Sequence, residues 1–180
     1  MELFGVDIQS LAVFRISAAL LIFYDLITRL PDIQAFYSDQ GVLPRFFLFQ
    51  QVHFIAPSAY FMTGSVFGVL ILFLFTGLSA VALLVGWHTR PATFAAWFLS
   101  MSLQLRNPYV LNAGDQVLCL VLFWEMFLPL GQAYSVDAIV RPLEAAPAPR
   151  SVFSVGTVAF LGQVSMIYLF TFILKFDNSE

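Results

Sequence analysis

The chain has 180 residues, of which 60% are hydrophobic and 11% charged, and its formal net charge is -3. A soluble globular domain carries roughly 25% charged residues, so this composition excludes one and indicates a protein whose solvent is lipid. The eight Lys and Arg residues are scattered singly, which excludes a basic surface for nucleic acid. A single cysteine, Cys119, excludes an intrachain disulfide and a thiolate metal site.

The first apolar run extends from Leu11 to about Leu30. The residues before it include acidic but no basic side chains, which is the wrong charge for a signal peptide. We therefore expect the run to stay attached and to form the first membrane span, since about 20 helical residues cross a hydrocarbon core. Two charged residues, Arg15 and Asp25, lie within it.

The segment between Arg29 and Tyr60 mixes Phe-rich runs with polar residues and is interrupted by helix breakers, namely Pro31, Gly41, Pro44 and Pro57. It is too apolar for a solvated loop and too interrupted for a spanning helix. We predict an interfacial segment that lies at the level of the lipid headgroups.

Four further apolar stretches predict membrane spans. Residues from Met62 to Trp87 carry no charge and give the clearest span. The third span starts at Pro91 and runs to about Leu105, the fourth runs from about Asp115 to Leu130, and the fifth is Val152 to Leu174. Residues 131–150 hold three prolines and predict a linker outside the membrane. The expected fold is an all-α integral membrane bundle of about five transmembrane helices with an interfacial segment after the first.

Ionisable side chains inside the predicted spans need partners, because each costs at least about 2.5 kcal/mol at membrane depth. Asp25 and Arg29 stand four residues apart, which favours a local salt bridge. Arg15 lies about 15 Å along the helix from Asp25 and cannot pair with it. Glu125, in the middle of the fourth span, is the candidate partner of Arg15. Such a pair is either a structural tie between two spans or a polar floor for a buried ligand.

The densest cluster of polar and turn-forming residues runs from Arg106 to Asp115. Asp115 can be the N-cap of the fourth span, with Asn112 and Gly114 serving the turn. Alternatively, Arg106, Asn112 and Asp115 line the mouth of a cavity between helices, where irregular backbone is tolerated at membrane depth. The two interpretations are compatible.

The remaining candidates are isolated residues. His53 and His88 lack the companions that a helical metal site requires, so no metal site is predicted and both are interpreted as interfacial polar residues. Hydrolase, zinc protease and nucleotide-binding motifs do not occur. Lys175 follows a long apolar span and is either a snorkelling interfacial anchor or a desolvated lysine that acts as a base.

Several short motifs together are similar to a known family, and they occur in order: Leu11–Ile16, Tyr24–Leu26, Arg29–Pro31, Tyr37–Pro44, Arg106–Pro108, Asn112–Asp115 and Leu128–Gly131. They resemble the horizontally transferred transmembrane (HTTM) domain, the bacterial relatives of the vitamin K-dependent gamma-carboxylase. The likeness spans nearly the whole chain, so we expect one such domain over residues 1–180.

The resemblance implies a helical membrane domain related to enzymes that carboxylate glutamate with oxygen and reduced vitamin K. It also implies a pocket for a quinone or hydroquinone, and it places Lys175 where the family has the lysine that deprotonates the hydroquinone. The tryptophan that follows this lysine in the family is replaced by Glu180, and the further spans and C-terminal domain of the carboxylases do not follow. Carboxylase-like activity is therefore implied by resemblance only, in a domain that is incomplete relative to the carboxylases.

The leading functional hypothesis is a multi-pass HTTM-like protein of the bacterial cytoplasmic membrane with an inter-helix pocket. It requires Lys175, Arg15 and Asp115 to converge on one cavity. The alternative is a non-enzymatic membrane subunit or maturation partner of another protein, in contact with that protein or with a second copy of itself.

Overall fold

The structure is a computed structural model that describes residues 5–51, 57–140 and 151–177. Its main elements are β1 (Val6–Asp7), α1 (Ile8–Arg29), α2 (Ile33–Tyr37), α3 (Arg45–Gln51), α4 (Val66–Val85), α5 (Thr89–Arg106), α6 (Ala113–Glu125), α7 (Val136–Ile139), β2 (Ser151–Val152) and α8 (Val155–Asp177). Short 3-10 helices occur at Leu30–Asp32, Ala59–Phe61 and Pro108–Val110. The interpretation of His53 falls outside the described residues, as do Glu180 and half of the predicted linker.

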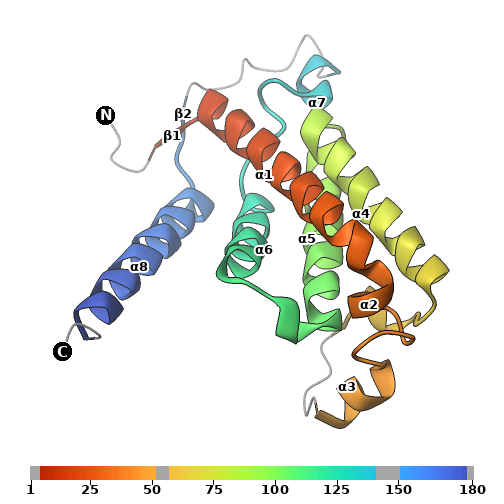
Figure 1. Ribbon diagram of the computed structural model, residues 1–180. Coiled ribbons are helices and arrows are strands. Elements are labelled where there is room, and N and C mark those ends of the chain that lie inside the picture. Colours follow the sequence, from red (N-terminus) through yellow and green to blue (C-terminus); the bar gives the residue numbers. More distant parts are fainter. Residues whose placement is uncertain (1–4, 52–56, 141–150, 178–180) are drawn as a thin grey trace.

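Four helices form the body of the molecule. Helix α4 packs against both α1 and α5, and α5 packs against α6, as Figure 1 shows. Small buried residues such as Ala19, Ala80 and Ala96 let these helices approach closely. Helix α8 diverges from this bundle, and its start is tied to the start of α1 by the antiparallel pairing of Val6 with Val152.

Within the described residues, three helical stretches are long and apolar enough to cross a membrane: Ile8–Tyr37, Val66–Val85 and Val155–Phe176. They correspond to the first, second and fifth predicted spans. Helices α5 and α6 occupy the other two predicted spans, but α6 has 13 residues, about 20 Å of helix, which is shorter than a hydrocarbon core of about 30 Å. The mostly helical fold is confirmed, whereas the five-span bundle and the interfacial segment are not.

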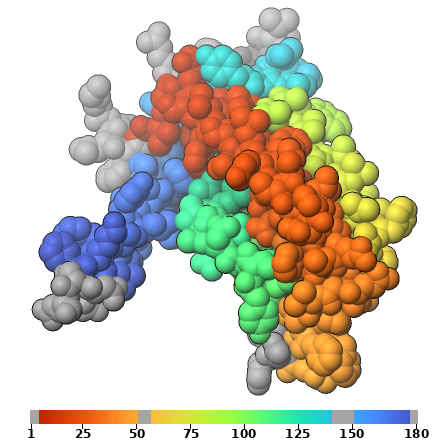
Figure 2. All heavy atoms as spheres, viewed as in Figure 1, coloured from red at the N-terminus to blue at the C-terminus, as the bar shows by residue number. Residues whose placement is uncertain are grey.

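The outward faces of the long helices are apolar. Exposed side chains include Leu20 on α1, Phe75 on α4 and Phe170 on α8. Figure 2 shows that α8 projects from the bundle along most of its length. Apolar surface of this extent on helices of spanning length indicates contact with a lipid bilayer.

The turn between α4 and α5 closes over the guanidinium group of Arg15. Gly86 ends α4 in the left-handed region, with φ of 72°. A Cβ atom at this position would collide with the Arg15 guanidinium and with the Ser135 side chain. The position therefore requires glycine for two reasons, its backbone conformation and its lack of a side chain.

Replacing Gly86 with alanine is expected to lower the free energy of unfolding by about 2 to 5 kcal/mol, since it adds left-handed strain to overpacking of a buried site. The matched control is Gly162→Ala in α8, where a Cβ meets no other atom within 4 Å. That change should be neutral or slightly stabilising because alanine favours helix. Denaturant unfolding in detergent micelles measures both, and equal effects would contradict the packing described for Gly86.

Asp137 of α7 holds the first turn of α5 in place. Its carboxylate accepts hydrogen bonds from the backbone N–H of His88 at 2.8 Å, and from the backbone N–H and hydroxyl of Thr89 at 2.8 and 2.9 Å. Burial acts to raise the pKa of Asp137, but these hydrogen bonds outweigh it and hold that pKa below its usual value. The ionised carboxylate of Asp137 therefore stabilises the folded state.

The stabilisation from Asp137 should be complete above its unfolded pKa of about 3.9 and lost as the pH falls through its lower folded pKa. We expect wild type to be more stable than Asp137→Asn at neutral pH, with the difference shrinking below about pH 4. Unfolding measured as a function of pH tests this. A difference that stays constant down to acidic pH would exclude the ionised carboxylate as its source.

Candidate functional site

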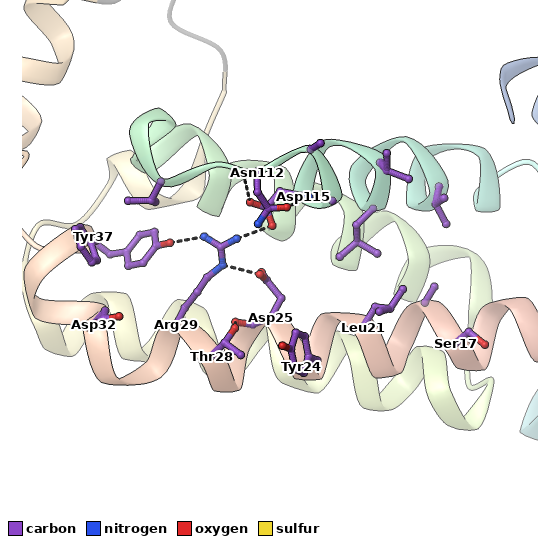
Figure 3. A pocket seen from close by; sticks show the side chains of 18 of the residues that line it. Ser17, Leu21, Tyr24, Asp25, Thr28, Arg29, Asp32, Tyr37, Asn112 and Asp115 are labelled. Atoms are coloured by element: carbon purple, nitrogen blue, oxygen red, sulfur yellow. Dashed lines mark hydrogen bonds and ion pairs between the residues drawn. The ribbon is translucent and has the colours of Figure 1, made fainter. Parts of the chain in front are cut away.

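A cavity of about 790 Å³ lies between α1 and α6 and is the candidate functional site. Its walls are mostly apolar and include Phe14, Leu21, Phe36, Leu118 and Val121. One end is polar, where Asp25, Arg29 and Asp32 from α1 and the turn after it meet Asn112 and Asp115 from the start of α6 (Figure 3). The site therefore combines an apolar slot with a charged end.

Helical spacing places the lining residues of α1 on one face. Phe14, Ser17, Leu21, Asp25 and Arg29 all line the cavity and recur every three or four residues. Side chains with this spacing lie above one another along an α-helix. The same periodicity in α6 brings Val117 and Val121 to the opposite wall of the slot.

Arg29 is the centre of the polar end. Its Nε donates to Asp25 Oδ1 at 2.7 Å, one terminal nitrogen donates to the Tyr37 hydroxyl at 2.5 Å, and the other donates to Asp115 Oδ1 at 2.6 Å. Figure 3 shows the guanidinium group between these three partners. The predicted salt bridge between Asp25 and Arg29 is confirmed. Arg29 also links α1, α2 and α6, a set of contacts that helical spacing within α1 does not predict.

The start of α6 is fixed by reciprocal capping. Asn112 is the N-cap, and its side chain accepts a hydrogen bond from Asp115 N at 3.1 Å. In return, Asp115 Oδ2 accepts a hydrogen bond from Asn112 N at 2.9 Å. The expectation that Asp115 is itself the N-cap is thus wrong: the N-cap is Asn112, and Asp115 is the third helical residue of the capping box. One carboxylate oxygen of Asp115 accepts from the N-cap backbone and the other binds Arg29. Asn112 and Asp115 also line the cavity, so both interpretations of this cluster hold for them.

Arg106 does not line this cavity, so the cavity-mouth alternative does not hold for this residue. It is completely buried at the end of α5, where it donates to the carbonyl oxygen of Leu43 at 2.8 Å and to Asp39 Oδ1 at 3.1 Å. Burial acts to raise the pKa of Asp39, but hydrogen bonds and charge from Arg45, together with the charge of Arg106, hold that pKa below its usual value. Arg106 therefore fastens the loop before α3 to the bundle.

Arg15 and Glu125 are both buried, but the predicted ion pair between them does not form directly. Arg15 instead donates to the carbonyl oxygens of Leu130 at 3.1 Å and Tyr134 at 2.6 Å. Among the described residues, its nitrogen atoms have no carboxylate oxygen within 4 Å. The reason is that the chain turns after Glu125 and presents backbone carbonyls to the guanidinium group. Neither residue lines the cavity.

The required convergence of Lys175, Arg15 and Asp115 on one cavity is not met. Asp115 lines the cavity, whereas Arg15 binds the loop after α6 and Lys175 is exposed in the last turn of α8. The cavity instead brings Asp25, Arg29 and Asp115 together, with Tyr37 as a further partner.

Membrane proteins hold ionisable side chains among their apolar helices mainly where those side chains are paired. The ion network around Arg29, at one end of an apolar cavity between helices, is typical of this class. The HTTM domain family model matches residues 5–179, and the chain belongs to this family. The resemblance expected from the motifs is confirmed. The family and the apolar helices together indicate an integral membrane protein. No curated protein and no solved structure matches the chain.

Proposed function

We propose that this HTTM-family protein binds an amphipathic molecule of the isoprenoid quinone class between α1 and α6. The observation that carries this proposal is the cavity itself, which is about 790 Å³, apolar along its walls and polar at one end. That volume lies within the range of small-molecule sites, which pair mostly apolar walls with a few fixed polar groups.

The shape of the cavity suits a ligand with a small polar head and a long apolar tail. Its lining on α1 extends from Phe14 to Arg29, which corresponds to about 22 Å of helix. A tail would lie along Phe14, Leu21 and Val121, and the head would lie beside Asp25 and Arg29. Exposed Leu21 and Val117 on the rim join the cavity to the lipid-facing surface, so a ligand could enter from the bilayer.

The polar end offers both acceptors and donors to such a head group. Asp25 Oδ1 accepts a hydrogen bond from Arg29, while no described residue donates to Asp25 Oδ2. This oxygen is available to a ligand hydroxyl, and the guanidinium N–H groups of Arg29 that are not already used can donate to a ligand carbonyl. A bound quinone or hydroquinone would supply redox chemistry, and the residues of this chain would bind and orient its head group.

We further propose that residues 1–180 form one multi-pass domain of a bacterial cytoplasmic membrane, with α5 and α6 as the remaining spans. The segment after α1 is proposed to lie at the interface, because α3 exposes Phe46, Phe47 and Phe49 while Leu48 is buried against the protein. The role of Lys175 as a base, and carboxylase-like activity, rest on the resemblance alone.

Thermal unfolding of the protein in detergent, with and without a short-chain menaquinone, tests the binding proposal. Ser17 is exposed on α1 and lines the cavity, so Ser17→Trp should fill the slot. Val13 is also exposed on α1 but does not line the cavity, which makes Val13→Trp the matched control. Menaquinone should raise the unfolding temperature of wild type and Val13→Trp but not that of Ser17→Trp. Equal shifts in all three proteins would place the ligand elsewhere.

The alternative role as a membrane subunit of another protein is favoured by one observation. Helix α8 is apolar and almost none of its residues are buried, so it has a large face on which another helix could pack. Co-purification of a stoichiometric partner would support this role. The partner should be lost when two exposed residues of α8 are changed, by Leu169→Trp and Phe172→Ala.

A further inference from the structure

A second buried polar site lies near the far end of α6 from the Arg29 network. Arg15 of α1 is 0% exposed and Glu125 of α6 is 1% exposed. The two terminal nitrogens of Arg15 donate to backbone carbonyls, but its Nε has no hydrogen-bond partner among residues 5–51, 57–140 and 151–177. Within the same ranges, both carboxylate oxygens of Glu125 also lack a partner. The described part of the chain therefore leaves three buried hydrogen-bonding atoms of these two side chains without partners.

Such an arrangement is energetically unfavourable unless something connects these atoms. A buried polar group without a hydrogen bond costs about 1 to 3 kcal/mol, and a charged one costs more. Arg15 and Glu125 are close enough to attract each other, yet their nitrogen and oxygen atoms are more than 4 Å apart. A water molecule fits this chemistry, since it can accept from Arg15 Nε and donate to a carboxylate oxygen.

A cavity of about 380 Å³ lies beside the loop that follows α6. Its lining includes Leu130, whose carbonyl oxygen accepts the hydrogen bond from Arg15. It also includes Gln132, whose side-chain oxygen is buried and has no hydrogen-bond partner in the part of the chain that the structure describes. His88, Arg90 and Asp137 contribute polar groups to the rim. This cavity brings a polar surface to the loop that holds Arg15. Ionisable residues at membrane depth commonly face a water-filled cavity of this kind.

We propose that this cavity admits water to a buried site between Arg15 and Glu125, where a bound water joins the Arg15 Nε to the Glu125 carboxylate. The site is independent of the proposed quinone pocket, because neither residue lines that pocket. The bridge would fasten α1 to the end of α6. It replaces the direct ion pair that the two residues do not make.

An experimental structure of the full chain, at a resolution that shows ordered water, tests the site directly. The expected result is water density within about 3 Å of both Arg15 Nε and a Glu125 oxygen. A direct contact between the two side chains with no water between them would overturn the proposal, and so would an empty or apolar gap.

Variants of Glu125 provide a second test that needs no structure. Glu125→Gln keeps an oxygen that accepts from water, so its unfolding temperature should fall by only a few degrees. Glu125→Met leaves Arg15 without its bridged partner and should lower the unfolding temperature by roughly 10 °C. The matched control is Leu122→Met, one turn earlier on α6 and 0% exposed, where the swap conserves volume. An unfolding temperature of Glu125→Met at or above that of wild type would overturn the proposal, as would equal losses for Glu125→Gln and Glu125→Met.

Discussion

Replacement of Arg29 by methionine is expected to lower the free energy of unfolding by roughly 3 to 5 kcal/mol, because it leaves two partly or fully buried carboxylates without their counter-charge. The side chains of Asp25 and Asp115 are 23% and 6% exposed, and each accepts a hydrogen bond from Arg29. The loss also removes the partner of the Tyr37 hydroxyl. We expect the variant to lose quinone binding as well, since Arg29 forms the polar end of the cavity.

The matched control is Arg90→Met, because Arg90 is exposed and makes no ion pair with the described residues. It should leave stability unchanged within error. Arg29→Lys should fall between wild type and Arg29→Met, since an ammonium keeps the charge but cannot reproduce the planar arrangement of three donors. Denaturant unfolding in micelles measures all three. If Arg29→Met were as stable as Arg90→Met, the network would contribute nothing to the fold.

The second large effect is expected at Arg15. Arg15→Ala should cost roughly 3 to 5 kcal/mol, because it removes both hydrogen bonds of a fully buried side chain and leaves the buried Glu125 without the charge of Arg15. Lys175→Ala should have no measurable effect on stability, since Lys175 is exposed at the end of α8. Comparing the two variants therefore distinguishes an arginine that stabilises the fold from a lysine that does not.

Unfolding of both variants in the same detergent gives the comparison. A small effect of Arg15→Ala, equal to that of Lys175→Ala, would contradict the tight binding of Arg15 by the loop carbonyls. Loss of a measured activity in Lys175→Ala with an unchanged fold would instead support the role that the resemblance implies for this lysine.

Local spacing predicted part of the polar network from the sequence. Asp25 and Arg29 are four residues apart on one helix, so their pairing follows from helix geometry. The contact between Arg29 and Asp115 joins residues far apart in the chain, and it depends on how α1 and α6 pack. Sequence spacing carries no direct signal for such a contact, although a cationic side chain at the end of one span and an acidic one at the start of another suggest it.

The partners of Arg15 were missed for a different reason. Glu125 was the predicted partner because it lies at a similar depth in a predicted span. In the structure, the guanidinium group of Arg15 instead binds backbone carbonyls of the loop after α6. That loop exists because α6 ends at Glu125 rather than near Leu130. Pro129 disfavours helix at the residue before it, and this signal could have shortened the predicted span.

The most direct test of the proposed function is native mass spectrometry of the protein extracted gently from its own membrane. If the proposed quinone site exists, wild type and Val13→Trp should each retain one molecule per chain with the mass of an isoprenoid quinone. The same molecule should be absent from Ser17→Trp, in which the slot between α1 and α6 is filled. Wild type without any retained small molecule, or equal retention in Ser17→Trp, would contradict a binding role for this cavity.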